Sequence, residues 1–318
     1  MARQQLTSLR HYLNQQVLGQ SEFIEQLLIA LLCGGHLLVE SPPGLAKTRA
    51  IKALSHIIDG NFQRIQFTPD LLPSDVTGTD IFRMQTNDFA FQRGPIFHNL
   101  LLADEINRAP AKVQSALLEA MAENQVTVGQ RTYKLPRLFM VMATQNPLEQ
   151  EGTYPLPEAQ LDRFLFKIEL DYPDREQELA ILELNDAEAQ HRTITKPTPL
   201  TQDQLFQLRD ALMQVHLAPA LKQYIVDLII ATRHSERYDS SLANWIEYGA
   251  SPRATIALAR SARAYAFLQD RDFVTPDDIQ KLAHSVLRHR VLLSYQAIAQ
   301  GVTPDMVIQR LLEHVSVA

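Results

Sequence analysis

The segment from Glu40 to Thr48, which reads Glu-Ser-Pro-Pro-Gly-Leu-Ala-Lys-Thr, constrains the possible folds of this chain more than any other. Residues 37–39 before it are apolar, as in a buried strand, and residues 47–58 after it carry apolar side chains at helical spacing. A strand, a tight loop and a helix that opens with Lys-Thr form the setting of a phosphate-binding loop. In such a loop backbone N–H groups and the helix N-terminus face the phosphates, Lys47 adds a positive charge, and the Thr48 hydroxyl can hold Mg²⁺.

Two positions of this loop differ from the common form G-x-x-x-x-G-K-[ST], because Ser41 and Ala46 stand where that form has glycine. Both residues are small, so a close approach of the backbone to phosphate is preserved, but a positive φ at either would cost energy. Gly44 is then the glycine that remains inside the loop. The candidate nucleotide-binding residues of the loop are Ser41, Pro42, Pro43, Gly44, Leu45, Ala46, Lys47, Thr48 and Arg49.

A pair of acids, Asp104 and Glu105, follows the apolar run 100–103. Acids at the carboxyl end of a parallel strand lie where open α/β sheets bind ligands. We expect Asp104 to orient Mg²⁺ and its waters, and Glu105 to polarise the attacking water. The alternative is a strand that ends in an acidic turn, and the phosphate-binding loop upstream favours the functional interpretation.

An amide, Asn146, follows the next apolar run, 138–143. At that strand end it would lie beside the two acids and could hold the attacking water against the terminal phosphate. A turn asparagine with satisfied hydrogen bonds, placed before Pro147, explains the same pattern by itself.

The composition is that of a globular protein, with 318 residues, 46% hydrophobic and 21% charged residues. The net charge of −6 and the lack of a Lys/Arg run argue against a dominant role in nucleic-acid binding. The single cysteine, Cys33, excludes an intramolecular disulfide and is expected to be a buried thiol. Because the N-terminus has no signal-peptide pattern and no apolar run has spanning length, we expect a cytoplasmic protein without membrane insertion.

The first part of the chain, residues 1–190, alternates strand and helix patterns and predicts an α/β domain. Ser21 is predicted to cap its second helix. Residues 75–94 have poor periodicity and are predicted to form an insertion with a hairpin or loop, and residues 126–135 to form a β-hairpin. A helix is expected from Asp174 to about Leu184.

The second part of the chain, residues 200–318, has helical periodicity throughout and predicts a separate all-helical domain. The polar stretch 185–199, which contains two prolines, is the candidate linker. His284 and His289 do not share a helical face and have no acid or cysteine cluster beside them, so no metal ligands are assigned among the histidines.

Taken together, five motifs resemble those of the MoxR-type AAA+ ATPases, in the right order and through nearly the whole chain. The blocks at 67–75 and 104–110 are specific to that family, and Ser41 is the departure from its usual loop. The motifs are Ser-Pro-Pro-Gly-Leu-Ala-Lys-Thr at 41–48, Phe-Thr-Pro-Asp-Leu-Leu-Pro-Ser-Asp at 67–75, Asp-Glu-Ile-Asn-Arg-Ala-Pro at 104–110, Ala-Thr-Gln-Asn-Pro at 143–147 and Gly-Ala-Ser-Pro-Arg at 249–253.

The resemblance implies an AAA+ αβα sandwich with a central parallel sheet and a C-terminal all-α lid domain. It implies that residues 75–94 are the helix-2 insertion and 126–135 the presensor-1 hairpin. It also assigns roles: Lys47 and Thr48 to Walker A, Asp104 and Glu105 to Walker B, Asn146 to sensor 1, Arg163 to the arginine finger, Arg253 to sensor 2, and Val17, Leu18, Gly19 and Gln20 to the adenine contact. For Arg163 and Arg253 the alternative is a surface ion pair.

The activity that the resemblance implies is Mg²⁺-dependent ATP hydrolysis by a ring, usually a hexamer. Such proteins act as chaperones that mature or activate protein complexes, often by inserting metal cofactors, with von Willebrand A-domain proteins as partners. Alternatives are a magnesium-chelatase-like motor subunit, a DNA-acting motor and a nucleotide-gated scaffold. A DNA-acting motor would need a basic hairpin, and 126–135 offers only Arg131 and Lys134. The Asp104–Glu105 pair argues against the scaffold.

Overall fold

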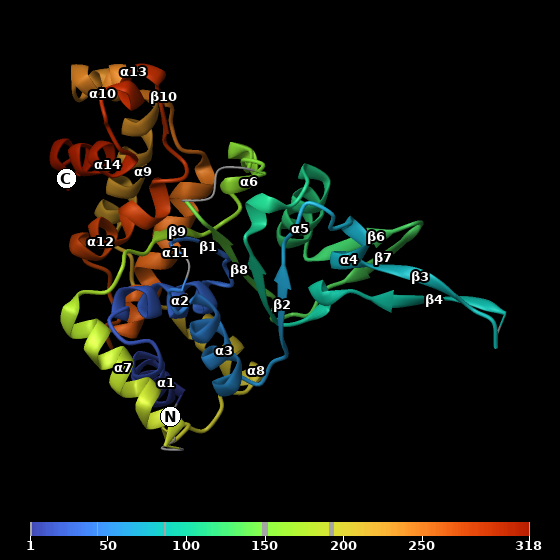
Figure 1. The fold of residues 1–318 in the computed structure, drawn as a ribbon. Coiled ribbons are helices and arrows are strands. Elements are labelled where there is room, and N and C mark those ends of the chain that lie inside the picture. The colour runs from blue at the N-terminus through green and yellow to red at the C-terminus, as the bar shows by residue number, and fades with distance from the viewer. Residues whose placement is uncertain (1, 43, 86, 148–151, 191–193, 318) are drawn as a thin grey trace. The chain divides into compact units, whose positions relative to one another are not determined.

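The structure, a computed structural model, describes residues 2–42, 44–85, 87–147, 152–190 and 194–317 (Figure 1). The chain divides into two compact units, one of Met1–Arg163 with Ile168–Leu205 and one of Phe164–Lys167 with Phe206–Ala318. Among the described residues, no helix combines the length and the apolar character needed to cross a membrane.

A five-stranded sheet forms the centre of the first unit, in the order β2-β5-β8-β1-β9. The pairs β2–β5, β5–β8 and β8–β1 are parallel, which confirms the predicted parallel sheet. Because parallel strands end at the same edge, the carboxyl ends of β1, β5 and β8 lie side by side. The strands are β1 (Leu37–Glu40), β2 (Phe62–Gln66), β5 (Leu100–Asp104), β8 (Met140–Gln145) and β9 (Phe166–Glu169).

Helix α3 (Lys47–Ile57) closely follows the predicted helix 47–58. Ser21 is the first residue of α2 rather than its cap, since Gln20 occupies the cap position, and Gly34 ends that helix with a left-handed φ of 64°. The helices up to the boundary with the second unit are α1 (Ala2–Gln16), α2 (Ser21–Cys33), α3 (Lys47–Ile57), α4 (Pro73–Thr77), α5 (Ala111–Glu123), α6 (Glu158–Leu161), α7 (Arg175–Ala189) and α8 (Gln202–Leu212), which crosses that boundary.

Helix α7 is longer than predicted and takes up part of the predicted linker 185–199. Its start follows the prediction, because the Asp174 side chain accepts a hydrogen bond from the Gln177 backbone N–H at 2.9 Å. Its end continues to Ala189 because residues 185–189 include good helix formers and because Glu188 forms an ion pair with Arg49 of α3. The sequence of the stretch alone does not show this distant partner.

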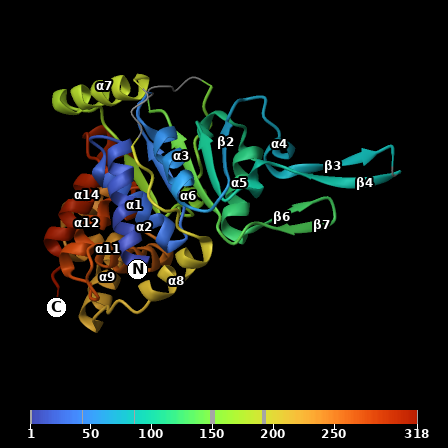
Figure 2. The same cartoon turned by 90° about the horizontal axis from the view of Figure 1, so that it is seen from below.

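Two antiparallel hairpins extend from the sheet region side by side (Figures 1 and 2). They are β3 (Gly78–Arg83) with β4 (Asp88–Arg93), and β6 (Gln125–Val128) with β7 (Arg131–Lys134). The rings of Phe91 and Tyr133 stack between them at a centroid distance of 4.0 Å. Toward its tip the β3–β4 hairpin exposes large apolar side chains, those of Ile81, Phe82, Met84 and Phe89.

The second unit is mainly helical, as predicted, with one short antiparallel strand pair that the sequence pattern did not show. This pair joins β10 (Ile246–Tyr248) to β11 (Leu292–Leu293). Strands of two or three residues are too short for a visible alternation, and their pairing depends on segments far apart in the chain. The helices are α9 (Pro219–Arg233), α10 (Ser240–Trp245), α11 (Pro252–Leu268), α12 (Pro276–Leu287), α13 (Tyr295–Ala299) and α14 (Pro304–His314).

Two buried side chains of the second unit, those of His289 and Arg290, hold the backbone that follows Arg163. The Phe164 carbonyl oxygen accepts hydrogen bonds from His289 Nε2 at 3.1 Å and from Arg290 Nη2 at 2.5 Å. Among the described residues, the buried His289 Nδ1 has no hydrogen-bond partner. Burial, and then the positive charge of Arg290, hold the pKa of His289 well below its usual value of 6.5.

The low pKa of His289 predicts a loss of stability in mild acid. Below pH 6.5 the unfolded chain takes up a proton at this histidine and the folded chain does not, so the free energy of unfolding falls as the pH falls. The expected slope is up to about 1.4 kcal/mol per pH unit for this one proton. Chemical denaturation from pH 7.5 to 5 measures it. The slope should shrink in His289→Gln and persist in a matched variant of the exposed His234, His234→Gln; equal slopes in both would contradict the assignment.

Candidate functional site

The loop between β1 and α3 adopts its shape with one left-handed residue. Gly44 has φ +84°, whereas Ala46 has φ −60° and Ser41 is not among the residues with positive φ. The two positions that lack the usual glycine therefore carry no backbone strain in this conformation. Ser41 is buried, and its N–H donates to the Gln145 carbonyl oxygen at 3.2 Å, which ties the loop to β8. Pro43 lies outside the described residues.

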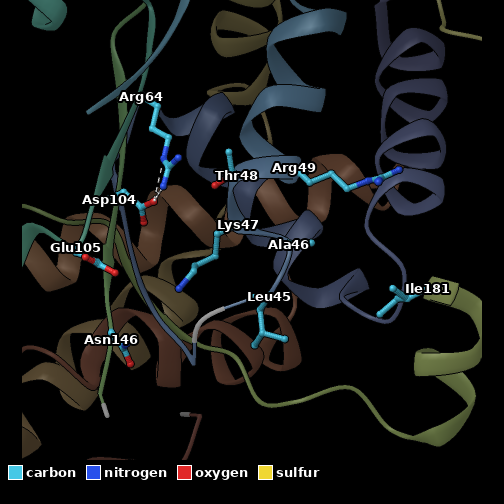
Figure 3. Close-up of a pocket in the computed structure, with 11 residues that line it drawn as sticks. Leu45, Ala46, Lys47, Thr48, Arg49, Arg64, Asp104, Glu105, Asn146 and Ile181 are labelled. Carbon is cyan, nitrogen blue, oxygen red and sulfur yellow. Dashed lines mark hydrogen bonds and ion pairs between the residues drawn. The ribbon is translucent and has the colours of Figure 1, made fainter. Parts of the chain in front are cut away.

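A cavity of about 520 Å³ opens at the carboxyl edge of the sheet (Figure 3). It brings together most of the residues to which the sequence analysis assigned phosphate, metal and water chemistry. The lining residues are Gly44, Leu45, Ala46, Lys47, Thr48, Arg49, Arg64, Asp104, Glu105, Asn146 and Ile181. These come from the ends of β1, β2, β5 and β8, the start of α3, and α7.

Lys47 folds back onto its own loop. Its Nζ donates to the carbonyl oxygens of Ser41 at 3.3 Å and Pro42 at 3.5 Å. Burial lowers the pKa of Lys47, and the carboxylates of Asp104 and Glu105 oppose that shift. A phosphate in the cavity offers this cation a charged acceptor in place of two neutral carbonyls, and charge-assisted hydrogen bonds are the stronger kind.

Both carboxylate oxygens of Asp104 accept hydrogen bonds. Thr144 Oγ1 donates to Oδ1 at 2.6 Å, and Arg64 donates to Oδ2 through Nε at 3.0 Å and Nη2 at 2.6 Å. The Asp104 side chain is therefore fixed in orientation toward the cavity.

Glu105 has a left-handed backbone, with φ 56° and ψ 50°. This conformation is uncommon for residues other than glycine, and such residues are often found at functional sites. The Glu105 N–H donates to Thr144 Oγ1 at 2.9 Å, and Oε2 accepts from Gln66 Nε2 at 2.8 Å and Arg108 Nη1 at 3.1 Å. Asn146 is buried at the end of β8 and lines the same cavity.

The oxygen donors in this cavity fit Mg²⁺. The Thr48 hydroxyl and the Asp104 carboxylate are hard ligands on two sides of one cavity, and Mg²⁺ is commonly held by one or two protein oxygens together with phosphate and water. No cluster of three or more His, Cys, Asp or Glu side chains suited to a metal exists within the described ranges. The protein therefore offers a partial coordination shell, as expected where a nucleotide supplies the rest.

A second cavity, of about 360 Å³, adjoins the loop on the side of α7. Leu18 and Gln20, which were predicted to contact adenine, line it. Val17 instead belongs to the apolar core, and Gly19, with φ +73°, packs against Gln177 of α7. Tyr172, Pro173, Glu178, Ile181, Leu184 and Asn185 also line this cavity and were not predicted, since nothing in the pattern of α7 indicates which face it turns to the loop.

Arg49 borders both cavities, but its side chain points away from Lys47 (Figure 3). Its guanidinium binds both oxygens of the Glu188 carboxylate and donates to Gln16 Oε1 at 3.3 Å. Arg49 therefore joins α3 to α1 and α7. Its guanidinium is engaged in these contacts, and the other atoms of Arg49 line the cavities.

Four polar residues at the acids were not predicted: Arg64, Gln66, Arg108 and Thr144. Arg64 and Gln66 flank the buried Ile65 on β2, and the register pairs Gln66 with Asp104 of β5. The alternation of polar and apolar residues on β2 could have indicated that Arg64 and Gln66 share one face of the sheet. It does not indicate that β2 lies beside β5, because strand order is not visible in the pattern of one strand.

The two predicted arginines lie outside the cavity lining. Arg163 follows α6 and is half-buried, and within the described part of the chain it has no ion pair and its buried Nε has no hydrogen-bond partner. Arg253 is exposed in the first turn of α11, where its N–H donates to the Ser251 side chain at 3.1 Å. The surface ion pair considered as an alternative for Arg163 is therefore not found among these residues.

Comparisons with known proteins show the family to which this chain is similar. Residues 36–166 match the family described as "ATPase family associated with various cellular activities (AAA)", and residues 241–311 match the family described as "AAA lid domain". The chain is 45% identical over 304 residues to Chaperone MoxR1 of Mycobacterium tuberculosis, covering 94% of this chain and 79% of that relative. It is 44% identical to the Bacillus subtilis protein YeaC (96% of this chain, 92% of the relative) and 32% identical to protein MoxR of Paracoccus denitrificans (93% and 91%).

A solved structure from Cytophaga hutchinsonii has a similar fold and sequence. Its TM-score to this chain is 0.92 at 44% identity, covering 100% of this chain and 96% of that one. The similarity therefore includes both the sheet with its loops and the helical region.

Proposed function

Because this chain belongs to the MoxR-type AAA+ ATPases, we propose that it hydrolyses ATP with Mg²⁺ and uses the cycle to remodel a protein client. One observation carries the proposal: Lys47, Thr48, Asp104, Glu105 and Asn146, from three separate segments, line one cavity.

In the proposed reaction the loop and the start of α3 hold the phosphates through backbone N–H groups, while Lys47 neutralises their charge. Thr48 and Asp104 would hold Mg²⁺, which would neutralise part of the negative charge of the phosphates. Glu105 accepts a proton from the attacking water, and Asn146 holds that water in line with the terminal phosphate. The cavity on the side of α7 takes the base, with Leu18 and Gln20 on its wall.

The proposed active unit is a ring in which neighbouring subunits complete each site. Arg163 would reach the nucleotide of a neighbouring subunit, and Arg253 would contact the nucleotide of its own chain.

 Arg163 is half-buried and has no ion pair among the described residues, so its guanidinium is available for a contact with another chain, which supports this role. A hexameric ring, a protein client and a von Willebrand A-domain partner are part of the proposal, and the relative named Chaperone MoxR1 supports the client. The exposed apolar side chains of the β3–β4 hairpin offer a surface for contact with protein.

The competing functions have weaker support. A magnesium-chelatase subunit homologue from Methanocaldococcus jannaschii is 26% identical over 61% of this chain, against 45% over 94% for the MoxR1 relative. A DNA-acting motor would need a basic surface on its hairpins, and the β3–β4 hairpin carries two acids, Asp80 and Asp88, beside Arg83 and Arg93.

Lys47→Ala is expected to abolish tight nucleotide binding, because the cavity loses the loop cation that meets the phosphates. Equilibrium binding of a fluorescent ATP analogue measures the effect, with the exposed Lys112→Ala on α5 as the matched control. An unchanged affinity in Lys47→Ala would overturn the assignment of the loop to phosphate binding and with it the proposed ATPase activity.

A further inference from the structure

The contact between Arg64 and Asp104 has no part in the reaction proposed for this cavity. Arg64 extends from β2 to the end of β5 (Figure 3). Two of its nitrogens donate hydrogen bonds to the same oxygen, Asp104 Oδ2, Nε at 3.0 Å and Nη2 at 2.6 Å. Thr144 Oγ1 donates to Oδ1 at 2.6 Å. The carboxylate that would orient Mg²⁺ therefore already has a cation on one oxygen and a hydroxyl donor on the other.

The two sides of this ion pair differ in how firmly they are held. The Asp104 side chain is 13% exposed and is fixed by Thr144, whereas the Arg64 side chain is 50% exposed. The Arg64 guanidinium also contacts the Gln66 side chain on the same strand, whose Oε1 accepts from Nη2 at 2.8 Å. When a competing cation enters the cavity, Arg64 is thus the partner that can move at low cost.

We infer that Arg64 is a positioning residue that occupies Asp104 until Mg²⁺ arrives with ATP and displaces it. The inference rests on the proposed function. Hydrated Mg²⁺ and the guanidinium are both donors to the same carboxylate oxygen and both carry positive charge, so they exclude each other there. Arg64 keeps Asp104 neutralised while the cavity holds no metal, and it raises the Mg²⁺ concentration at which Asp104 becomes available.

Removal of Arg64 is therefore expected to strengthen Mg²⁺ binding and to weaken ATP binding in the absence of Mg²⁺. Without Arg64, Mg²⁺ need not displace a cation, so it should bind at lower concentration. In the absence of Mg²⁺, however, the uncompensated Asp104 carboxylate repels the phosphates, so ATP should bind more weakly. The coupling between Mg²⁺ and ATP binding, which is the same whichever ligand is added first, should therefore increase.

The test is a Mg²⁺ titration of the full chain with a fluorescent, non-hydrolysable ATP analogue, read by anisotropy. Arg64→Gln is expected to lower the midpoint in Mg²⁺ by about threefold to fivefold, the upper range for a partly exposed ion pair. It is also expected to bind the analogue more weakly in EDTA. Arg64→Lys keeps the charge without the paired contact and should shift the midpoint less, in the same direction. Arg131→Gln, on the β6–β7 hairpin, is the matched control and should titrate like the parent chain.

Each other outcome overturns the inference. If the Mg²⁺ midpoint of Arg64→Gln is equal to or above that of the parent chain, Arg64 does not compete with Mg²⁺ for Asp104. A loss of affinity that is equal with and without Mg²⁺ makes Arg64 a direct phosphate ligand instead. Circular dichroism and thermal unfolding check that the variants are folded, and if Arg64→Gln is not, the direction of the Arg64→Lys shift decides. If the parent chain binds no analogue at any Mg²⁺ concentration, the proposed function fails, and that result is distinct from an unchanged midpoint.

Discussion

Replacing Glu105 by glutamine is expected to leave ATP and Mg²⁺ bound while lowering turnover by about 10² to 10⁴-fold, the usual contribution of a general base. The amide has the size of the carboxylate but cannot accept the proton of the attacking water. Its carbonyl oxygen can still accept from Gln66 and Arg108, which now bind Oε2 at 2.8 Å and 3.1 Å, so the local geometry should survive. Steady-state phosphate release and equilibrium ATP binding, measured on the same preparation, separate the two effects.

The control for this substitution is Glu123→Gln, which makes the same chemical change at an exposed residue of α5. It should hydrolyse ATP at the parent rate. Parent-rate hydrolysis by Glu105→Gln would remove Glu105 from the role of base. Because the Glu105→Gln chain should stay loaded with ATP, it is also the form in which a client can be captured for identification.

Arg163→Ala is expected to leave nucleotide binding by a single subunit intact and to lower hydrolysis by a factor on the order of 10³. Arg163 does not line the nucleotide cavity of its own chain, so its removal should not disturb binding there. Its proposed action is on the charge that develops on the phosphate of a neighbouring subunit in the transition state. ATPase rates at several protein concentrations test this, since a site shared between subunits forms only where rings form.

A mixing experiment makes the prediction for Arg163 more specific. Arg163→Ala subunits retain an intact loop, and Lys47→Ala subunits retain an intact arginine, so a mixed ring places both at some interfaces. Partial recovery of turnover is expected, because neighbours are arranged at random. If Arg163 acts within its own chain, mixing the two inactive variants should restore nothing. If Arg163 lies only in a surface contact, Arg163→Ala should hydrolyse ATP at nearly the parent rate by itself, and mixing should add nothing.

Local sequence patterns were enough to predict the centre of this protein. The apolar strand 37–39, the loop with Lys47 and the following helix are adjacent in the chain, so their order alone places the loop at a strand end. In the same way, the position of Asp104 directly after the apolar run 100–103 places it at a strand end. Alternating strands and helices then imply a parallel sheet, and the carboxyl ends of its strands must meet at one edge. The roles of Arg163 and Arg253 were implied only by family resemblance and remain predictions.

The tertiary structure determines which other side chains surround the predicted site residues. Arg64 reaches Asp104 across 40 positions of sequence, because β2 pairs with β5 in one register, and a shift by one residue would turn Arg64 away. Arg49 meets Glu188 across 139 positions, a contact that joins α3 to α7 beside the second cavity. Periodicity and turn composition describe only neighbours in the chain, whereas these contacts depend on strand order, register and packing, which arise when distant segments bury their apolar faces together.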